Sequence, residues 1–152
     1  MLYDSLKERL LNQHSGIYEI IKNADDAKIL YNPEHGKWNI HDNIAHLAIY
    51  QPIFINRIHR ILKENNPEFN AYRADDDPDF IVAQQLSLNE LLDKLEGDRE
   101  EIYFFIITLS HEQLTRTGTH LKYGKLTIAD WVEFFLLHEA HHLFTIFKLA
   151  KG

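Results

Sequence analysis

Apolar residues recur at a spacing of about 3.6 residues in four long stretches, and this periodicity limits the fold more than any other feature. A helix with this pattern has one apolar face, which it must bury against another element. The first stretch predicts an amphipathic helix that ends around Asp25 and has an apolar face made of Leu2, Leu6, Leu10, Ile17 and Ile21.

Three further helices begin at capping signals, in which a cap side chain and the side chain three residues later each bond the other's backbone. The pairs are Asn39 with Asp42, Ser87 with Glu90, and Thr127 with Asp130. With the periodicity that follows them, they predict helices at about 39 to 63, 87 to 108, and 127 nearly to the terminus. A further pair, Ser110 with Gln113, predicts one more short helical turn.

The segments between these helices lack periodicity. Residues 64 to 78, with the acidic run Asp75, Asp76 and Asp77, predict a long crossover loop, and residues 118 to 124 predict a turn. No stretch has a convincing strand pattern. The predicted fold is therefore all-α: an antiparallel four-helix bundle with a long crossover between helices two and three. A chain of 152 residues is expected to form one domain, 1–152.

Composition disfavours several classes of function. A net charge of -7 opposes nucleic-acid binding, and no apolar run approaches the ~20 residues of a membrane span. Residues 1 to 11 lack the features of a signal peptide, so a cytoplasmic location is expected. The chain has no cysteine, so any thiol chemistry needs a thiol from a partner molecule.

Three histidines are the candidate metal ligands. His138 and His142 are four residues apart, so on a helix both rings project from one face and can meet a single ion. Both fall in the apolar stripe, where a metal would satisfy one nitrogen on each ring. His46, in the middle of the second helix, is the best candidate for a third ligand. The alternatives are a hydrated pair at the end of the bundle and a hydrogen-bonded core residue at His46.

Residues 138 to 142 also fit the H-E-x-x-H motif of zinc proteases, with Glu139 as the general base. Those enzymes usually take a third ligand downstream, and the ten residues after His142 contain neither a histidine nor an acid. The protease hypothesis therefore fails. Glu139 remains a weak candidate for a base or for a residue that supports the ligands, and it could simply be solvated.

The other histidines have weaker claims. His141 faces another side of its helix, and His120, in the turn before the last helix, could hydrogen-bond near the site. Surface or turn positions are predicted for His14, His35, His41, His59 and His111. Tyr50 and Arg57 could line a pocket, although a packed tyrosine and an exposed arginine are the simpler expectations.

Several motifs together resemble a known family. Trp38 precedes a cap residue, His46 lies in the run NIAHLAIYQPIFINRI, Gly124 precedes LTIADWV, and HEAHHLFTIFKL closes the chain. With these motifs, essentially the whole sequence resembles the DinB/YfiT-like superfamily of small metal-binding helical bundles. Asn39 and Asp42 depart from the usual serine or threonine and glutamate, but they keep the capping role.

The resemblance implies a divalent metal, zinc or nickel first and iron or manganese next, on His46, His138 and His142. Characterised relatives include bacillithiol S-transferases and mycothiol-dependent isomerases, which implies a small-molecule thiol and an electrophile as partners. Relatives also form homodimers. The leading hypothesis is thus metal-dependent thiol transfer. The alternatives are hydrolysis with Glu139 or an acid of residues 75 to 77 as base, a non-enzymatic metal-binding stress-response protein, and a helical domain without metal.

Overall fold

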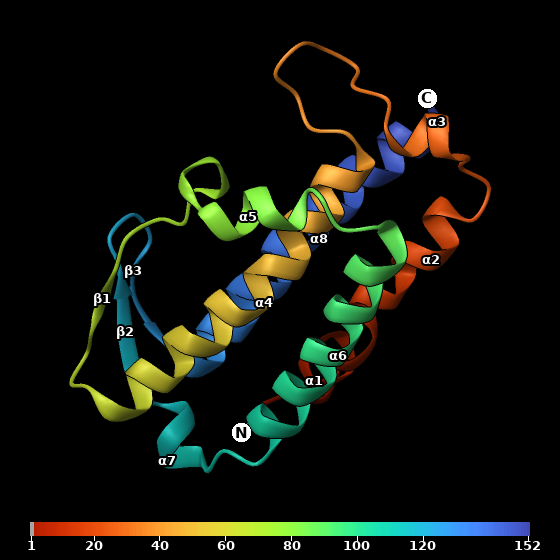
Figure 1. The fold of residues 1–152 in the computed structure, drawn as a ribbon. Coiled ribbons are helices and arrows are strands. Elements are labelled where there is room, and N and C mark those ends of the chain that lie inside the picture. Colours follow the sequence, from red (N-terminus) through yellow and green to blue (C-terminus); the bar gives the residue numbers. More distant parts are fainter. Residues whose placement is uncertain (1) are drawn as a thin grey trace.

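The structure is a computed structural model, and it describes residues 2–152. Four long helical stretches dominate it, as the periodicity predicts (Figure 1). They are a first stretch made of α1 (Asp4–Asn12), η1 (Gln13–Ser15) and α2 (Gly16–Ile21), then α4 (Ile40–Lys63), α6 (Leu88–Ile107) and α8 (Ile128–Lys151).

The predicted capping boxes are all present. In each box the cap side chain accepts a hydrogen bond from the third helical residue, whose own side chain accepts one from the cap backbone. These boxes begin α4, α6, the short α7 (His111–Leu114) and α8. Local chemistry thus fixes where the helices that carry the site begin.

The first helix is interrupted, contrary to the prediction of one continuous helix. A 3-10 turn spans Gln13–Ser15, and the Ser15 hydroxyl donates to the Asn12 carbonyl over 2.6 Å. Serine competes for backbone hydrogen bonds and Gly16 has low helix propensity, so this point breaks most readily. A short α3 (Asp26–Ile29), capped by the Asp25 side chain, follows α2.

Helices α4 and α8 run antiparallel. Asn43, early on α4, contacts His142, late on α8, whereas Phe54, later on α4, stacks on Phe135, earlier on α8. This arrangement brings the middle of α4 beside the second half of α8, where the candidate ligands lie.

Helices α4 and α6 run in the same direction, because the crossover returns the chain to the end at which α4 began (Figure 1). Gln51 accepts a hydrogen bond from Arg99, and further along both helices His59 packs on Phe105. The predicted long crossover is therefore confirmed, and it is what makes α4 and α6 parallel.

A small sheet corrects the expectation that the chain has no strands. β2 (Thr117–His120) and β3 (Gly124–Thr127) form an antiparallel hairpin, and β1 (Glu68–Phe69) pairs in parallel with β2. The crossover also contains η2 (Ala74–Asp76) and α5 (Pro78–Ala83). Strands of two to four residues are too short to show a clear alternation in sequence.

Gly118 lets this sheet pack closely on the bundle. A Cβ at this position would lie 2.8 Å from Ile61 Cγ1 and 2.9 Å from Phe69 Cε2. The buried Trp131 indole donates to the Gly118 carbonyl over 3.3 Å. The hairpin is therefore joined to both α4 and α8.

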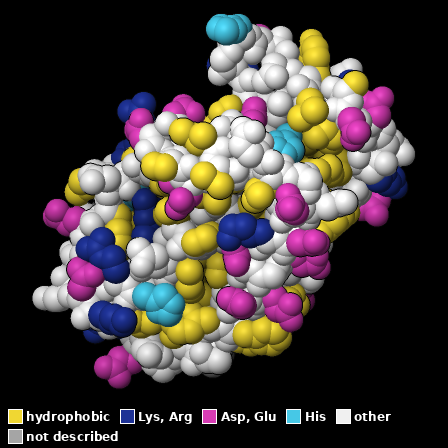
Figure 2. All heavy atoms as spheres, in the orientation of Figure 1, with side chains coloured by type: hydrophobic (Ala, Val, Ile, Leu, Met, Phe, Trp, Pro, Cys, Tyr) yellow, Lys and Arg dark blue, Asp and Glu magenta, His cyan; other side chains and the backbone are white. Residues whose placement is uncertain are grey.

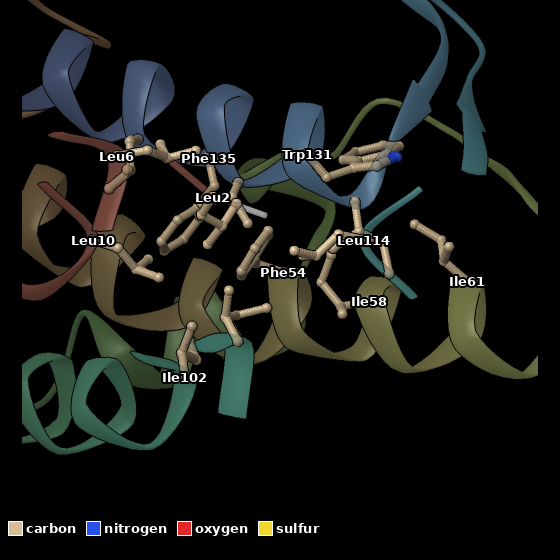
Figure 3. Packing of buried hydrophobic residues seen from close by; sticks show 14 of the residues in the cluster. Leu2, Leu6, Leu10, Phe54, Ile58, Ile61, Ile102, Leu114, Trp131 and Phe135 are labelled. Carbon is tan, nitrogen blue, oxygen red and sulfur yellow. The ribbon is translucent and has the colours of Figure 1, made fainter. Parts of the chain in front are cut away.

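The apolar core has two parts along the bundle. One, shown in Figure 3, includes Leu6, Leu10, Phe54, Ile58, Ile102, Trp131 and Phe135. The other includes Ile17, Ile44, Leu47, Phe80, Leu91, Leu95 and Ile146. Four of the buried polar side chains lie on the same long helices as these apolar residues. They are His46, Gln51, Arg99 and Glu139.

Neither sign of charge dominates the face of the molecule that is drawn in Figure 2. Acidic and basic side chains are interspersed over the face in Figure 2. Among the described residues, no helix has the length and apolar character needed to cross a bilayer.

Candidate metal centre

Three histidines from two antiparallel helices meet in the bundle. His46 comes from α4, and His138 and His142 come from successive turns of α8. Each offers one nitrogen, and these three atoms lie within 4.8 Å of one another. Across residues 2–152 this is the one group of three or more histidine or acidic side chains with such spacing.

Burial keeps these rings neutral. It is the main cause that lowers the pKa of His46 to about 2, of His138 to about 4 and of His142 to about 3. A neutral imidazole has one ring nitrogen with a free lone pair, which is the form that binds a metal. The three rings are therefore ready to act as ligands at neutral pH.

Asn43 determines the tautomer of His142. The Asn43 amide nitrogen donates to the Asn39 carbonyl over 2.8 Å, and its oxygen lies 2.9 Å from Nδ1 of His142. Because that oxygen can only accept, His142 Nδ1 carries the proton and Nε2 has the lone pair. This is the support that metal-bound histidines commonly receive from a neighbouring oxygen. Sequence reasoning missed Asn43, although it precedes His46 by three residues on the same helix.

The ring nitrogens of His46 and His138 show whether these residues fit a metal. Nε2 of His46 and Nε2 of His138 lie 3.0 Å apart, so either a proton or a cation must lie between their lone pairs. Nδ1 of each ring is buried without a hydrogen-bond partner in the described chain. Three neutral imidazoles converging in a buried place suit a divalent ion that prefers nitrogen ligands.

Aromatic side chains enclose the centre. Tyr72 stacks on His46 with ring centroids 5.8 Å apart, and Tyr50 lies 4.4 Å from His138. Trp38 lies 5.2 Å from His46. The predicted packing of Tyr50 is thus confirmed, and the rings restrict water around the histidines.

An open cavity of about 660 Å³ reaches the centre at His142. Its lining residues include Trp38, Asn43, His142 and Asp75. Its volume suits a small molecule. Of the acidic run 75 to 77, only Asp75 lines this cavity, because Asp77 caps α5 and accepts a hydrogen bond from the Tyr72 hydroxyl.

Glu139 lies in the core, and the expectation that it could be solvated is wrong. It is 1% exposed, pairs with the equally buried Arg99, and accepts a further hydrogen bond from Gln13 over 3.0 Å. Its position on α8, about 100° around the helix from His138, directs it to the first helix and α6. Its carboxylate is therefore occupied by Arg99 and Gln13.

Two of the histidines predicted at the surface are buried. His14 lies against Arg99, and burial, followed by that charge, lowers its pKa to about 4. His41 bonds the Leu86 carbonyl through Nε2 over 2.8 Å. Their burial depends on tertiary partners that periodicity does not reveal. The exposed positions predicted for the others are confirmed, and these are His35, His59 and His111.

His120 and His141 do not join the cluster. His120 is buried in β2, where its Nδ1 accepts from the backbone of Lys122 and Tyr123, so its hydrogen bonds shape the hairpin. His141 is exposed on another side of α8, as predicted. Arg57 differs from its prediction, because it is buried rather than exposed.

Together these features define a class: a four-helix bundle whose second and last long helices join three histidines in one centre. The chain belongs to the DinB superfamily, whose family model matches residues 10–146. The family resemblance seen in the sequence is therefore confirmed.

Two relatives are similar over most of the chain. OB0413 of Oceanobacillus iheyensis, by name a candidate metal-dependent hydrolase, is 26% identical to this chain over 128 residues. The matched region covers 82% of this chain and 72% of OB0413. YfiT from Bacillus subtilis, described as a probable metal-dependent hydrolase with an unusual four-helix bundle topology, superposes with a TM-score of 0.81 at 18% identity. That match covers 97% of this chain and 85% of YfiT, and it confirms the fold.

Proposed function

We propose that His46, His138 and His142 bind one divalent metal ion, and that this centre activates a small-molecule nucleophile. The convergence of three neutral imidazoles, one buried and two half-buried, carries the proposal. The names of OB0413 and YfiT, both described as metal-dependent, support it. Zinc or nickel suits this set of nitrogen ligands best, and iron or manganese comes next.

When bound, the ion supplies Lewis acidity that lowers the pKa of a thiol or of water in its open position. The residues of the chain orient this chemistry. Asn43 holds His142 in the ligating tautomer, and Tyr50 and Tyr72 limit access of water. The open cavity beside His142 leaves room for the small molecule.

The nucleophile that we place first is a low-molecular-weight thiol. Its sulfur would form a bond to an electrophilic carbon in the cavity, and the leaving group on that carbon would depart with its bonding electron pair. A divalent ion held by the three histidines would promote the ionisation of this thiol, so the reaction would not need Glu139, whose carboxylate pairs with Arg99. The chain has no cysteine, so the sulfur must come from the cosubstrate.

Hydrolysis is the second candidate, favoured by the names of both relatives. Since Glu139 is paired in the core, the base for water would come from the cavity wall. Asp75 and Glu34 are the carboxylates that line it, and both side chains are exposed. This version predicts that Asp75→Asn or Glu34→Gln lowers hydrolysis without weakening metal binding.

A paired assay separates the candidates. Metal-loaded protein is given monochlorobimane with bacillithiol, mycothiol or glutathione, and in parallel a panel of esters and amides without thiol. The expected result is thiol-dependent loss of the electrophile that His142→Ala abolishes and His59→Ala keeps, since His59 is exposed on α4 and does not line this cavity. Turnover only without thiol would support the hydrolase. If neither reaction occurs, the centre has a structural role, and metal removal should change only the melting temperature.

A further inference from the structure

Arg57 is a buried arginine without a carboxylate partner. Its side chain lies on α4 and is 7% exposed. Nη2 donates to the Asn70 carbonyl over 2.8 Å, whereas Nη1 is buried and has no hydrogen-bond partner in the described chain. Its guanidinium lies 5.5 Å from the ring centroids of both Phe69 and Trp131, which hold it in place.

Arg57 differs in this respect from the other arginines. Carboxylate partners are present for four of them, in the pairs Arg9–Glu133, Arg60–Glu64, Arg73–Asp76 and Arg99–Glu139. Arg116 is exposed and donates to two backbone carbonyls. A buried guanidinium without a countercharge is costly, and burial accordingly lowers the pKa of Arg57. The site therefore favours the entry of an anion.

A cavity of about 450 Å³ gives the anion a place. Arg57, Asn70, Ile53 and Tyr72 line it. It is separate from the cavity beside His142, with which it shares no lining residue. Tyr72 connects it to the histidine centre, because the same ring stacks on His46.

The acids in this wall are already engaged. Asp77 accepts the Tyr72 hydroxyl on one oxygen over 2.6 Å and the Asp79 backbone on the other over 2.9 Å. Asp76 pairs with Arg73. Asp76 and Asp77 therefore do not pair with Arg57, but their negative charges remain in the cavity wall. Because they repel an anion in proportion to its charge, a singly charged anion suits the cavity better than a doubly charged one.

We propose that Arg57 forms a carboxylate-binding subsite in this cavity, next to the histidine centre. The carboxylate reaches the Arg57 side chain from this cavity, accepts a hydrogen bond from the guanidinium and neutralises its charge. Binding depends on Arg57 and not on a metal, so it is tested on metal-free protein. Its outcome is thus independent of whether the proposed metal chemistry holds.

The test is a titration of metal-free protein with sodium acetate, at ionic strength held constant with sodium chloride. NMR of the arginine Nε–H groups reports on each arginine separately. We expect a saturable shift of the Arg57 signal and none of Arg60, which lies on the same helix beside the same Phe69 ring but pairs with Glu64. An Arg57 signal that does not saturate, or that moves equally with chloride alone, would overturn the proposal.

Variants and a second anion sharpen the test. Arg57→Lys should weaken acetate binding about tenfold, since it keeps the charge and loses the planar fork, and Arg57→Gln should abolish it. The matched control Arg60→Gln should bind as the unaltered protein does. Unchanged acetate affinity in Arg57→Gln would contradict the subsite, and tighter binding of inorganic phosphate than of acetate would contradict its assignment to carboxylates. If Arg57→Gln does not fold, the titration of the unaltered protein still decides.

Discussion

At the scale of single residues, the candidate centre depends on a side chain that is not a ligand. The Asn43 oxygen fixes the proton of His142 on Nδ1. Replacing Asn43 with leucine removes this acceptor, and such changes typically cost about 10–100-fold in metal affinity. Asn43→Asp keeps an acceptor and should retain most of the affinity. Zinc titration against a competing chelator measures both, and equal affinity of Asn43→Leu and the unaltered protein would contradict this role.

A substitution at Glu139 distinguishes a stabilising role of this residue from a catalytic one. Removing one partner of a buried ion pair costs about 3–5 kcal/mol, so Glu139→Gln should strongly lower the free energy of unfolding. The double variant with Arg99→Met should recover part of the loss, because no buried charge is then left alone. Urea unfolding tests this expectation. A Glu139→Gln protein that is fully stable but inactive in hydrolysis would instead identify Glu139 as the base.

The sequence predicts the candidate ligands but not the residues that contact them, for a physical reason. His138 and His142 are four residues apart in one helix, so helix geometry alone places their rings together. The hydrogen bonds of Asn43 to His142 and of Arg99 to Glu139 join different helices. No local pattern encodes such pairs, so the burial of Glu139 and Arg57 became visible only in the fold.

At the scale of elements, helix boundaries were predicted well because capping is local. The break in the first helix and the small sheet were not predicted, because a 3-10 turn and strands of two to four residues leave little periodicity in the sequence. The sheet nevertheless places strict demands on its residues, most of all at Gly118, whose missing side chain admits Ile61 and Phe69.

Two glycines should respond to alanine in opposite ways. Gly118→Ala forces a Cβ into occupied space and should destabilise the fold by about 1–3 kcal/mol. Gly97→Ala lies inside α6 with nothing within 4 Å, so it should stabilise by about 0.5–1 kcal/mol. Chemical denaturation compares the pair directly. A neutral Gly118→Ala would mean that the hairpin packs less closely than its distances imply.

At the scale of the whole molecule, two buried and two half-buried histidines couple folding to pH. Burial lowers the pKa of His14, His46, His138 and His142 to between about 2 and about 4. In the unfolded chain these rings titrate near 6.5, so below that pH the unfolded state binds more protons than the folded state. The contribution of these neutral rings to the free energy of unfolding is therefore fully present above about pH 6.5, and it is lost as the pH falls toward 4.

The expected slope of this loss is roughly 1.4 kcal/mol per pH unit for each ring. Denaturation of metal-free protein at several pH values between 7.5 and 4.5 measures it. Added zinc should raise stability most at neutral pH, because protons compete with the ion for the same nitrogens. A stability that stays flat from pH 7 to pH 5 would contradict the burial of neutral imidazoles.

The measurement that bears most directly on the central claim is the metal content of the purified protein after equilibrium dialysis against zinc or nickel. We predict one ion for each chain, lost in His46→Ala and kept in His59→Ala, an exposed histidine of the same helix. Loss of the ion from His46→Ala without loss of the fold would place α4 and α8 around a shared metal. No bound ion in the unaltered protein, or equal binding by His46→Ala, would contradict the three-histidine centre.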